Sequence, residues 1–104
     1  MRATRKSTEK ETQKAVLDYL KAKNIFHWRN NTGAMKTASG GFIRFGAIGS
    51  PDIFALAKGR AYGFEIKDEK GKQSPEQEMF ALSMTKAGGC YAVIRNVDEV
   101  MAIL

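Results

Sequence analysis

The spacing of apolar residues changes along this chain, from a helical period near the start to the alternation of strands further on. The segment from Thr8 to Asn24 is predicted to be a helix, because its apolar residues recur at helical spacing: Val16, Leu17 and Leu20. Thr8 and Glu11 have the Thr-x-x-Glu spacing of a capping box. A second helix is predicted to begin at Ser74-Pro75, a capping serine followed by a first-turn proline, and to end at Gly88-Gly89.

Strand-like runs bounded by turn residues fill most of the remaining chain. They are predicted at Ile25–Arg29, in a short run at Phe42–Phe45, and at Ile53–Ala57, Ala61–Lys67 and Cys90–Ile94. The segment Asn30–Gly41 is rich in Asn, Thr, Ser and Gly and is expected to be a loop, and Val97–Leu104 a short closing helix. Trp28 is expected in the core. This order predicts one α/β domain over residues 8–104, preceded by a loose basic arm at residues 1–7.

Composition and charge indicate the cellular compartment and the kind of partner to expect. A chain of 104 residues is long enough for one domain with a modest core. No apolar run approaches the ~20 residues that cross a bilayer, the N-terminus lacks a signal-peptide core, and no membrane partner is expected. The single Cys90 cannot form an internal disulfide, so a reducing, cytoplasmic setting is expected. Net charge is +6, from 17 basic and 11 acidic residues, which suits a polyanionic partner.

Candidate chemistry lies between Asp52 and Lys67. Residues two apart on a strand share a face, so Glu65 and Lys67 project together, and Asp52 is placed to meet Glu65 across the predicted hairpin. Two carboxylates beside a lysine are what a divalent metal needs for phosphodiester hydrolysis. The structural alternatives are a same-face ion pair between Glu65 and Lys67 and an ordinary turn aspartate at Asp52.

These residues are similar to the PD-(D/E)xK nuclease signature, and further motifs in the same order resemble the small stand-alone VRR-NUC proteins. The motifs are Glu11-Thr12-Gln13, Trp28-Arg29-Asn30-Asn31-Thr32-Gly33, Gly49-Ser50-Pro51-Asp52, Glu65-Ile66-Lys67, Ser74-Pro75-Glu76-Gln77 and Tyr91-Ala92-Val93-Ile94-Arg95. One departure is that the Val-Arg-Arg element of the family is present only as Val93-Ile94-Arg95, which leaves the role of Arg95 open. The resemblance implies a restriction-endonuclease-like mixed β-sheet flanked by helices.

The resemblance also implies a metal site for Mg²⁺ or Mn²⁺. Its ligands would be Asp52, Glu65, the backbone carbonyl of Ile66 and an acid of the first helix. Glu11 fits that last position best, with Glu9 as the alternative. The capping box, however, explains Glu11 without any metal.

Among the other site residues, Lys67 would serve the attacking water and Gln77 would lie near the active centre. Ser74 and Gln77 also have capping-box spacing, so that side chain has a second explanation. Polar and basic residues of the loop region are candidate DNA contacts: Asn30, Asn31, Thr32, Lys36 and Arg44.

The function implied by the resemblance is a metal-dependent DNA endonuclease with no small-molecule cofactor. It would act as a homodimer on branched DNA such as four-way (Holliday) junctions. Two alternatives remain open: a nicking or flap-directed nuclease without junction preference, and a non-catalytic basic module that only binds nucleic acid.

Overall fold

The computed structural model describes residues 7–30 and 33–104. Within them it has nine elements: α1 (Glu9–Ala22), β1 (Phe26–Arg29), β2 (Gly33–Lys36), β3 (Phe42–Phe45), β4 (Ile53–Ala57), β5 (Arg60–Ile66), α2 (Pro75–Lys86), β6 (Cys90–Ile94) and α3 (Val97–Ile103). No helix in this part of the chain has the length and apolar character to span a bilayer. The basic arm predicted at residues 1–7 lies outside the described residues except for Ser7.

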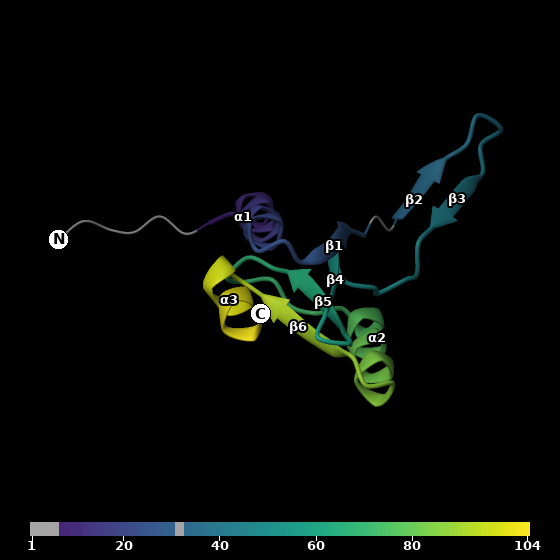
Figure 1. The fold of residues 1–104 in the computed structure, drawn as a ribbon. Coiled ribbons are helices and arrows are strands. Elements are labelled where there is room, and N and C mark those ends of the chain that lie inside the picture. The colour runs from purple at the N-terminus through teal and green to yellow at the C-terminus, as the bar shows by residue number, and fades with distance from the viewer. Residues whose placement is uncertain (1–6, 31–32) are drawn as a thin grey trace.

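The main sheet has four strands in the order β1-β4-β5-β6. Antiparallel pairs join β1 to β4 and β4 to β5, whereas β5 and β6 are parallel and are connected through α2. Helices α1 and α3 lie together on one side of this sheet and α2 lies on the other (Figure 1). A mixed four-stranded sheet flanked by three helices confirms the predicted α/β class.

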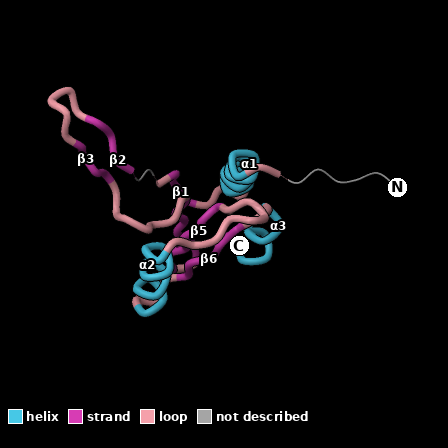
Figure 2. The backbone as a smooth tube through the Cα atoms, turned by 180° about the vertical axis from the view of Figure 1, so that it is seen from behind, coloured by secondary structure: helices cyan, strands magenta, loops and turns pink. Residues whose placement is uncertain are grey.

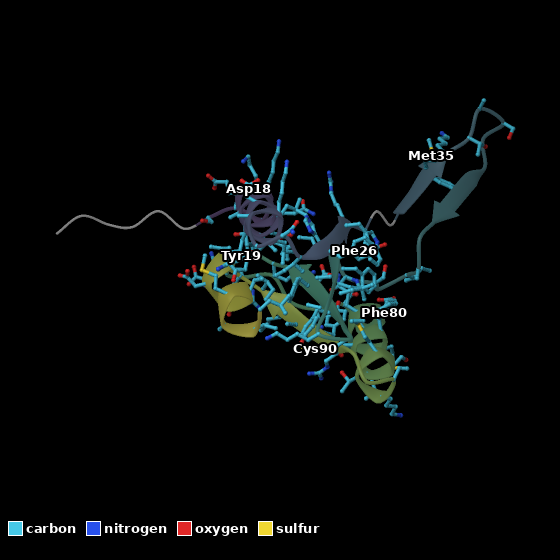
Figure 3. All side chains as sticks on the ribbon, in the orientation of Figure 1. Asp18, Tyr19, Phe26, Met35, Phe80 and Cys90 are labelled. Carbon is cyan, nitrogen blue, oxygen red and sulfur yellow. The ribbon has the colours of Figure 1, made fainter. Side chains whose placement is uncertain are left out.

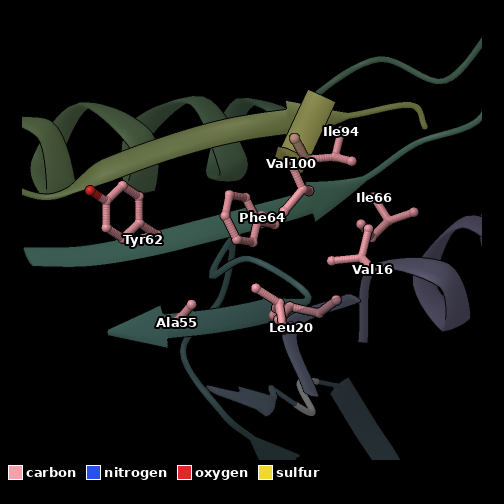
Figure 4. Packing of buried hydrophobic residues seen from close by; sticks show 9 residues of the cluster. Val16, Leu20, Ala55, Tyr62, Phe64, Ile66, Ile94 and Val100 are labelled. Atoms are coloured by element: carbon pink, nitrogen blue, oxygen red, sulfur yellow. The ribbon is translucent and has the colours of Figure 1, made fainter. Parts of the chain in front are cut away.

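The hydrophobic core lies between the sheet and the pair α1 and α3 (Figure 4). Phe64 and Ile66 of β5 point into it together with apolar residues from the flanking elements: Val16, Leu20, Ile53, Ala55, Tyr62, Ile94 and Val100. Because strand residues alternate, this burial leaves Glu65 facing the opposite side of the sheet, toward α2.

Local signals determine where the helices begin and end. Complete capping boxes form at the start of α1, with Thr8 and Glu11, and of α2, with Ser74 and Gln77, as predicted. Asn24 follows α1 with a positive φ of 58°, a conformation that Asn tolerates better than most residues and that ends the helix. The sequence therefore predicted where α1 begins and ends and where α2 begins.

One local prediction is wrong: the segment Asn30–Gly41 is not entirely loop. Gly33–Lys36 forms strand β2 and pairs with β3 in a separate two-stranded sheet. This hairpin projects away from the main sheet, as the two opposite views show (Figures 1 and 2), and carries Met35 with 58% of its surface exposed (Figure 3). The composition of β2 gives little strand signal, so its conformation comes from pairing with Phe42–Phe45.

The prediction that Trp28 belongs to the core is also wrong, because 43% of its surface is exposed. It lies on the α2 side of the sheet, where α2 contributes no fully buried residue. An uninterrupted row of aromatic rings crosses this side at centroid separations of 5.3–6.4 Å: Phe26, Trp28, Phe54, Phe80 and Tyr91. The far end of this row reaches Glu65 through the Tyr91 hydroxyl.

Candidate active site

Asp52 and Glu65 meet where β4 begins and β5 ends. Ile53 pairs with Phe64, so Asp52 lies opposite Glu65 across the antiparallel pair, as predicted. Oδ2 of Asp52 accepts a hydrogen bond of 2.7 Å from the backbone amide of Ile66, which fixes the carboxylate against the end of β5. Glu65 itself is only 4% exposed.

Two glycines allow the Asp52 segment to lie close to the sheet and to α2. A Cβ on Gly63 of β5 would come within 2.6 Å of Cγ of Pro51, so the bare backbone there makes room for the proline. Gly49 has a φ of +82°, and a Cβ on it would lie 2.2 Å from the Glu76 carbonyl oxygen at the start of α2. The segment from Gly49 to Asp52 is therefore held between the sheet and α2.

Asn30 holds the same segment from the other side. Its Nδ2 atom donates to Oγ of Ser50 at 2.7 Å and to the Pro51 carbonyl at 2.9 Å, and its backbone amide donates to the Asp52 carbonyl at 2.7 Å. Ser50 in turn donates from Oγ to the Ala47 carbonyl. Both donor positions of the Asn30 amide group are thus used within the protein, which makes Asn30 a support for Asp52.

Lys67 places its ammonium group beside the carboxylates. Nζ lies 3.7 Å from Oε2 of Glu65, and the side chain is 16% exposed. The backbone amide of Lys67 donates to the Ile94 carbonyl at 3.0 Å, and Nη1 of Arg95 donates to the carbonyl of the next residue, Asp68. The end of strand β6 and the residue that follows it therefore hold the backbone on both sides of the Lys67 side chain.

The positive charge near Asp52 and Glu65 does not balance the negative charge of the two carboxyl groups. Burial first, and then the neighbouring Asp52 carboxyl through its charge and a hydrogen bond, raise the pKa of Glu65 to about 8. Lys67 and a hydrogen bond from Tyr91 oppose this rise without cancelling it. The adjacent carboxyl groups thus hold a proton near neutral pH, in the position where a cation would compensate their charge.

Tyr91 and Gln73 also belong to the site, although the sequence predicted a site role for neither and Tyr91 entered only as part of a family motif. The Tyr91 hydroxyl lies 3.4 Å from Oε1 of Glu65 and 3.4 Å from the Gly49 carbonyl oxygen. Burial, and next the charge of Glu65, raise the pKa of Tyr91, whereas a hydrogen bond with Gln73 lowers it. Tyr91 stands two residues before Val93, the register partner of Glu65, and that offset on a parallel strand was the available sequence signal.

The acid expected from the first helix does not join the pair. Oε1 of Glu11 accepts a hydrogen bond of 3.0 Å from the Thr8 amide, which is the capping interaction. Across residues 7–30 and 33–104, no three His, Cys, Asp or Glu side chains form a group that could hold a metal ion, so neither Glu11 nor Glu9 completes a three-acid set. Gln77 likewise caps its own helix, accepting through Oε1 from the Ser74 amide at 2.9 Å.

The remaining predicted DNA contacts lie around the projecting hairpin. Lys36 is exposed at the end of β2, and Arg44 lies in β3, although its side chain is not among those described. Asn31 and Thr32 fall outside the described residues. The hairpin thus separates Lys36 from the carboxylate pair and places it on an arm beside the body (Figure 1).

The carboxylates suit a hard divalent cation. Mg²⁺ and Mn²⁺ prefer oxygen ligands, and Asp52 and Glu65 present adjacent carboxyl groups of which one is buried. The raised pKa of Glu65 shows that Lys67 alone does not balance the negative charge. The donor set and its charge both fit such an ion.

Comparisons with known proteins identify the fold. No known family profile matches the sequence, and a search of curated proteins found no significant match. Among solved structures, one described as a VRR_NUC domain is similar with a TM-score of 0.64 and 20% identity, covering 93% of this chain and 95% of the other. Another, a VRR_NUC domain protein, also has a TM-score of 0.64, with 23% identity over 95% of this chain and 86% of its own.

Fold and site together define a mixed α/β domain with an acid pair and a lysine at one end of its sheet. The chain has the fold of the VRR-NUC domain, and the resemblance carried by its motifs is confirmed at that level.

Proposed function

We propose that this protein is a Mg²⁺- or Mn²⁺-dependent endonuclease that hydrolyses phosphodiester bonds in DNA. The observation that carries the proposal is the convergence of Asp52, Glu65 and Lys67 at one point of the sheet, where the Ile66 amide donates a hydrogen bond to the Asp52 carboxylate. The basic character of the chain, +6 overall, supports a nucleic-acid substrate. The fold shared with VRR-NUC structures supports the same activity.

Asp52, Glu65 and the Ile66 carbonyl are the proposed metal ligands. The Ile66 amide already points toward Asp52, and the carbonyl of a strand residue leaves on the same side as its amide. A cation held there would activate the attacking water and stabilise the charge that develops on the phosphate. Lys67 would orient that water or neutralise the phosphate from beside Glu65.

We assign contact with the DNA backbone to the hairpin, through Lys36 and Arg44, and to Asn31 and Thr32, which precede β2 in the sequence. Lys36 is exposed on an arm that projects from the body, where it would reach phosphates away from the cleavage point. Each such contact would add to the salt dependence of binding.

We further propose that the protein acts as a homodimer on branched DNA. One site cuts one strand, so paired cuts across a junction require two sites related by symmetry. The α2 side of the molecule offers a surface for self-association, because large apolar residues there are exposed by 43–67%: Phe26, Trp28, Ile48, Leu56, Met79 and Leu82. A groove of about 480 Å³ beside α2 adds Pro75 and Phe80 to this surface.

The activity is tested with a labelled four-way junction and a linear duplex of the same sequence, each with Mg²⁺, Mn²⁺ or a chelator. We expect metal-dependent cleavage that Lys67→Ala reduces by about 10²–10⁴-fold. Lys70→Ala, an exposed lysine on the following loop, is the matched control and should cut normally. If the wild type bound DNA without cutting it, and Lys67→Ala bound equally well, the nuclease would be rejected and a binding module favoured.

The assembly is tested by light scattering on the eluting protein. We expect twice the mass of one chain for the wild type and a single-chain mass for Met79→Glu, while Glu78→Lys on the exposed side of the same helix stays dimeric. A monomer that cuts linear and branched DNA equally would support the nicking or flap-directed alternative.

A further inference from the structure

Tyr91 connects the strand that carries Glu65 with the segment that carries Asp52. It lies on β6 as the register partner of Gly63, so its side chain is on the same face of the sheet as Glu65. Its hydroxyl reaches Oε1 of Glu65 and the Gly49 carbonyl oxygen, both at 3.4 Å. These partners are 26 and 42 residues away in sequence, so one hydroxyl joins three separate parts of the chain.

The surroundings of Tyr91 hold its ring in place. The ring packs against Phe80 of α2 at a centroid distance of 6.2 Å. Gln73, in the loop before α2, forms a hydrogen bond with the hydroxyl. The ring contact belongs to the aromatic part of the side chain and would survive loss of the oxygen atom, so packing and hydrogen bonding are separable at this residue.

Resting on the metal site proposed above, we infer that Tyr91 is a positioning residue whose hydroxyl orients the Glu65 carboxylate toward Asp52. A carboxylate with one fixed hydrogen bond presents its other oxygen in a defined direction, which suits ligation by the pair. The contact with Gly49 extends this effect to the backbone three residues before Asp52. Tyr91 therefore sets how tightly the pair holds a divalent cation, without touching the reacting atoms.

The test is Tyr91→Phe, which keeps the ring and removes the hydroxyl. Mn²⁺ binding is measured without DNA by electron paramagnetic resonance, and the Mn²⁺ concentration for half-maximal cleavage is measured with DNA. We expect both values to rise about 10- to 100-fold, the usual cost of losing an outer partner of a metal ligand. The rate at saturating Mn²⁺ and the KM for DNA should stay within about threefold of wild type, since such a loss weakens ligation more than chemistry.

Two further variants keep the test decisive. Gln73→Leu, which removes the support of the hydroxyl from a loop, should shift both Mn²⁺ values in the same direction by a smaller factor. Tyr62→Phe removes a hydroxyl from the neighbouring strand on the core face and should leave both values unchanged.

The outcomes separate this inference from the proposed function. Wild-type binding and cleavage with an unchanged Mn²⁺ affinity in Tyr91→Phe would refute the positioning role alone. A lower rate at all Mn²⁺ concentrations with unchanged affinity would also refute it, because the effect would then lie in the reaction. A wild type that neither binds Mn²⁺ nor cuts DNA would overturn both.

Discussion

Gly63 lies directly beneath Pro51, so close that a Cβ on the glycine would be 2.6 Å from the proline Cγ. Pro51 is fully buried there and is followed at once by Asp52. The distance between the two carboxylates therefore depends on a position in β5 that carries no chemistry of its own.

Replacing Gly63 by Ala should separate Asp52 from Glu65. The new methyl group would press on Pro51 and on Sδ of Met84, which lies 3.2 Å away, and overpacking of this kind costs about 1–3 kcal/mol. We expect a lower melting temperature together with weaker Mn²⁺ binding, measured by calorimetry. Gly41→Ala is the control, because its nearest atom, Oγ1 of Thr37, is at an ordinary 3.5 Å. Unchanged Mn²⁺ binding in Gly63→Ala would show that the segment adjusts without moving Asp52.

Asn30→Ala distinguishes a structural support from a DNA contact. Two hydrogen bonds from Nδ2, to Ser50 and to Pro51, would be lost, and we expect a destabilisation of about 1–3 kcal/mol. In a domain of this size that lowers the melting temperature by about 4–8 °C for each kcal/mol. The slope of DNA affinity against salt concentration should stay the same. A flatter slope with normal stability would instead return Asn30 to the DNA interface.

Features encoded by nearby residues were predictable. The capping boxes at Thr8 and Ser74 and the strand alternation that sets Glu65 apart from Phe64 all depend on spacings of a few residues. The meeting of Asp52 with Glu65 follows from the two-residue turn at Lys58-Gly59, which sets the register of the hairpin.

Features that depend on distant partners were not predictable from these patterns. Strand β2 exists through its pairing with β3, and Trp28 is exposed because α2 leaves that part of the sheet open. Asn30 and Tyr91 have their roles through partners 20 to 42 residues away. For Glu11, both the capping and the metal explanation matched the sequence, and the structure shows the capping interaction.

Glu65→Gln should remove the contribution of this side chain to the pH dependence of stability in the metal-free protein. The folded-state pKa of Glu65 is raised from 4.5 to about 8, so its favourable protonated form is fully present below about pH 4.5. That contribution is lost as pH rises toward 8. We therefore expect the melting temperature of the wild type to fall relative to that of Glu65→Gln between pH 5 and pH 8, because a neutral amide does not titrate.

Scans of both proteins in a chelating buffer measure this difference directly. Mg²⁺ or Mn²⁺ should restore the wild type at pH 8 and leave Glu65→Gln unchanged, since the amide is a poorer ligand. The variant should also lose cleavage. Parallel pH curves for the two proteins would mean that Glu65 is already ionised at low pH and that Lys67 balances its charge.

Arg95 should affect the rate through the loop that follows Lys67. Nη1 of Arg95 donates to the Asp68 carbonyl, which holds the chain just beyond the lysine, and a catalytic group displaced by about 1 Å can lose up to about 100-fold in rate. We expect Arg95→Met to lower kcat by about 10- to 100-fold while leaving Mn²⁺ affinity unchanged, as measured by single-turnover cleavage. Arg60→Met is the matched control, because Nε of Arg60 donates to the Gly88 carbonyl at 3.1 Å, at the opposite end of β5. If Arg95→Met instead weakened DNA binding and flattened its salt dependence at normal kcat, Arg95 would be a phosphate contact.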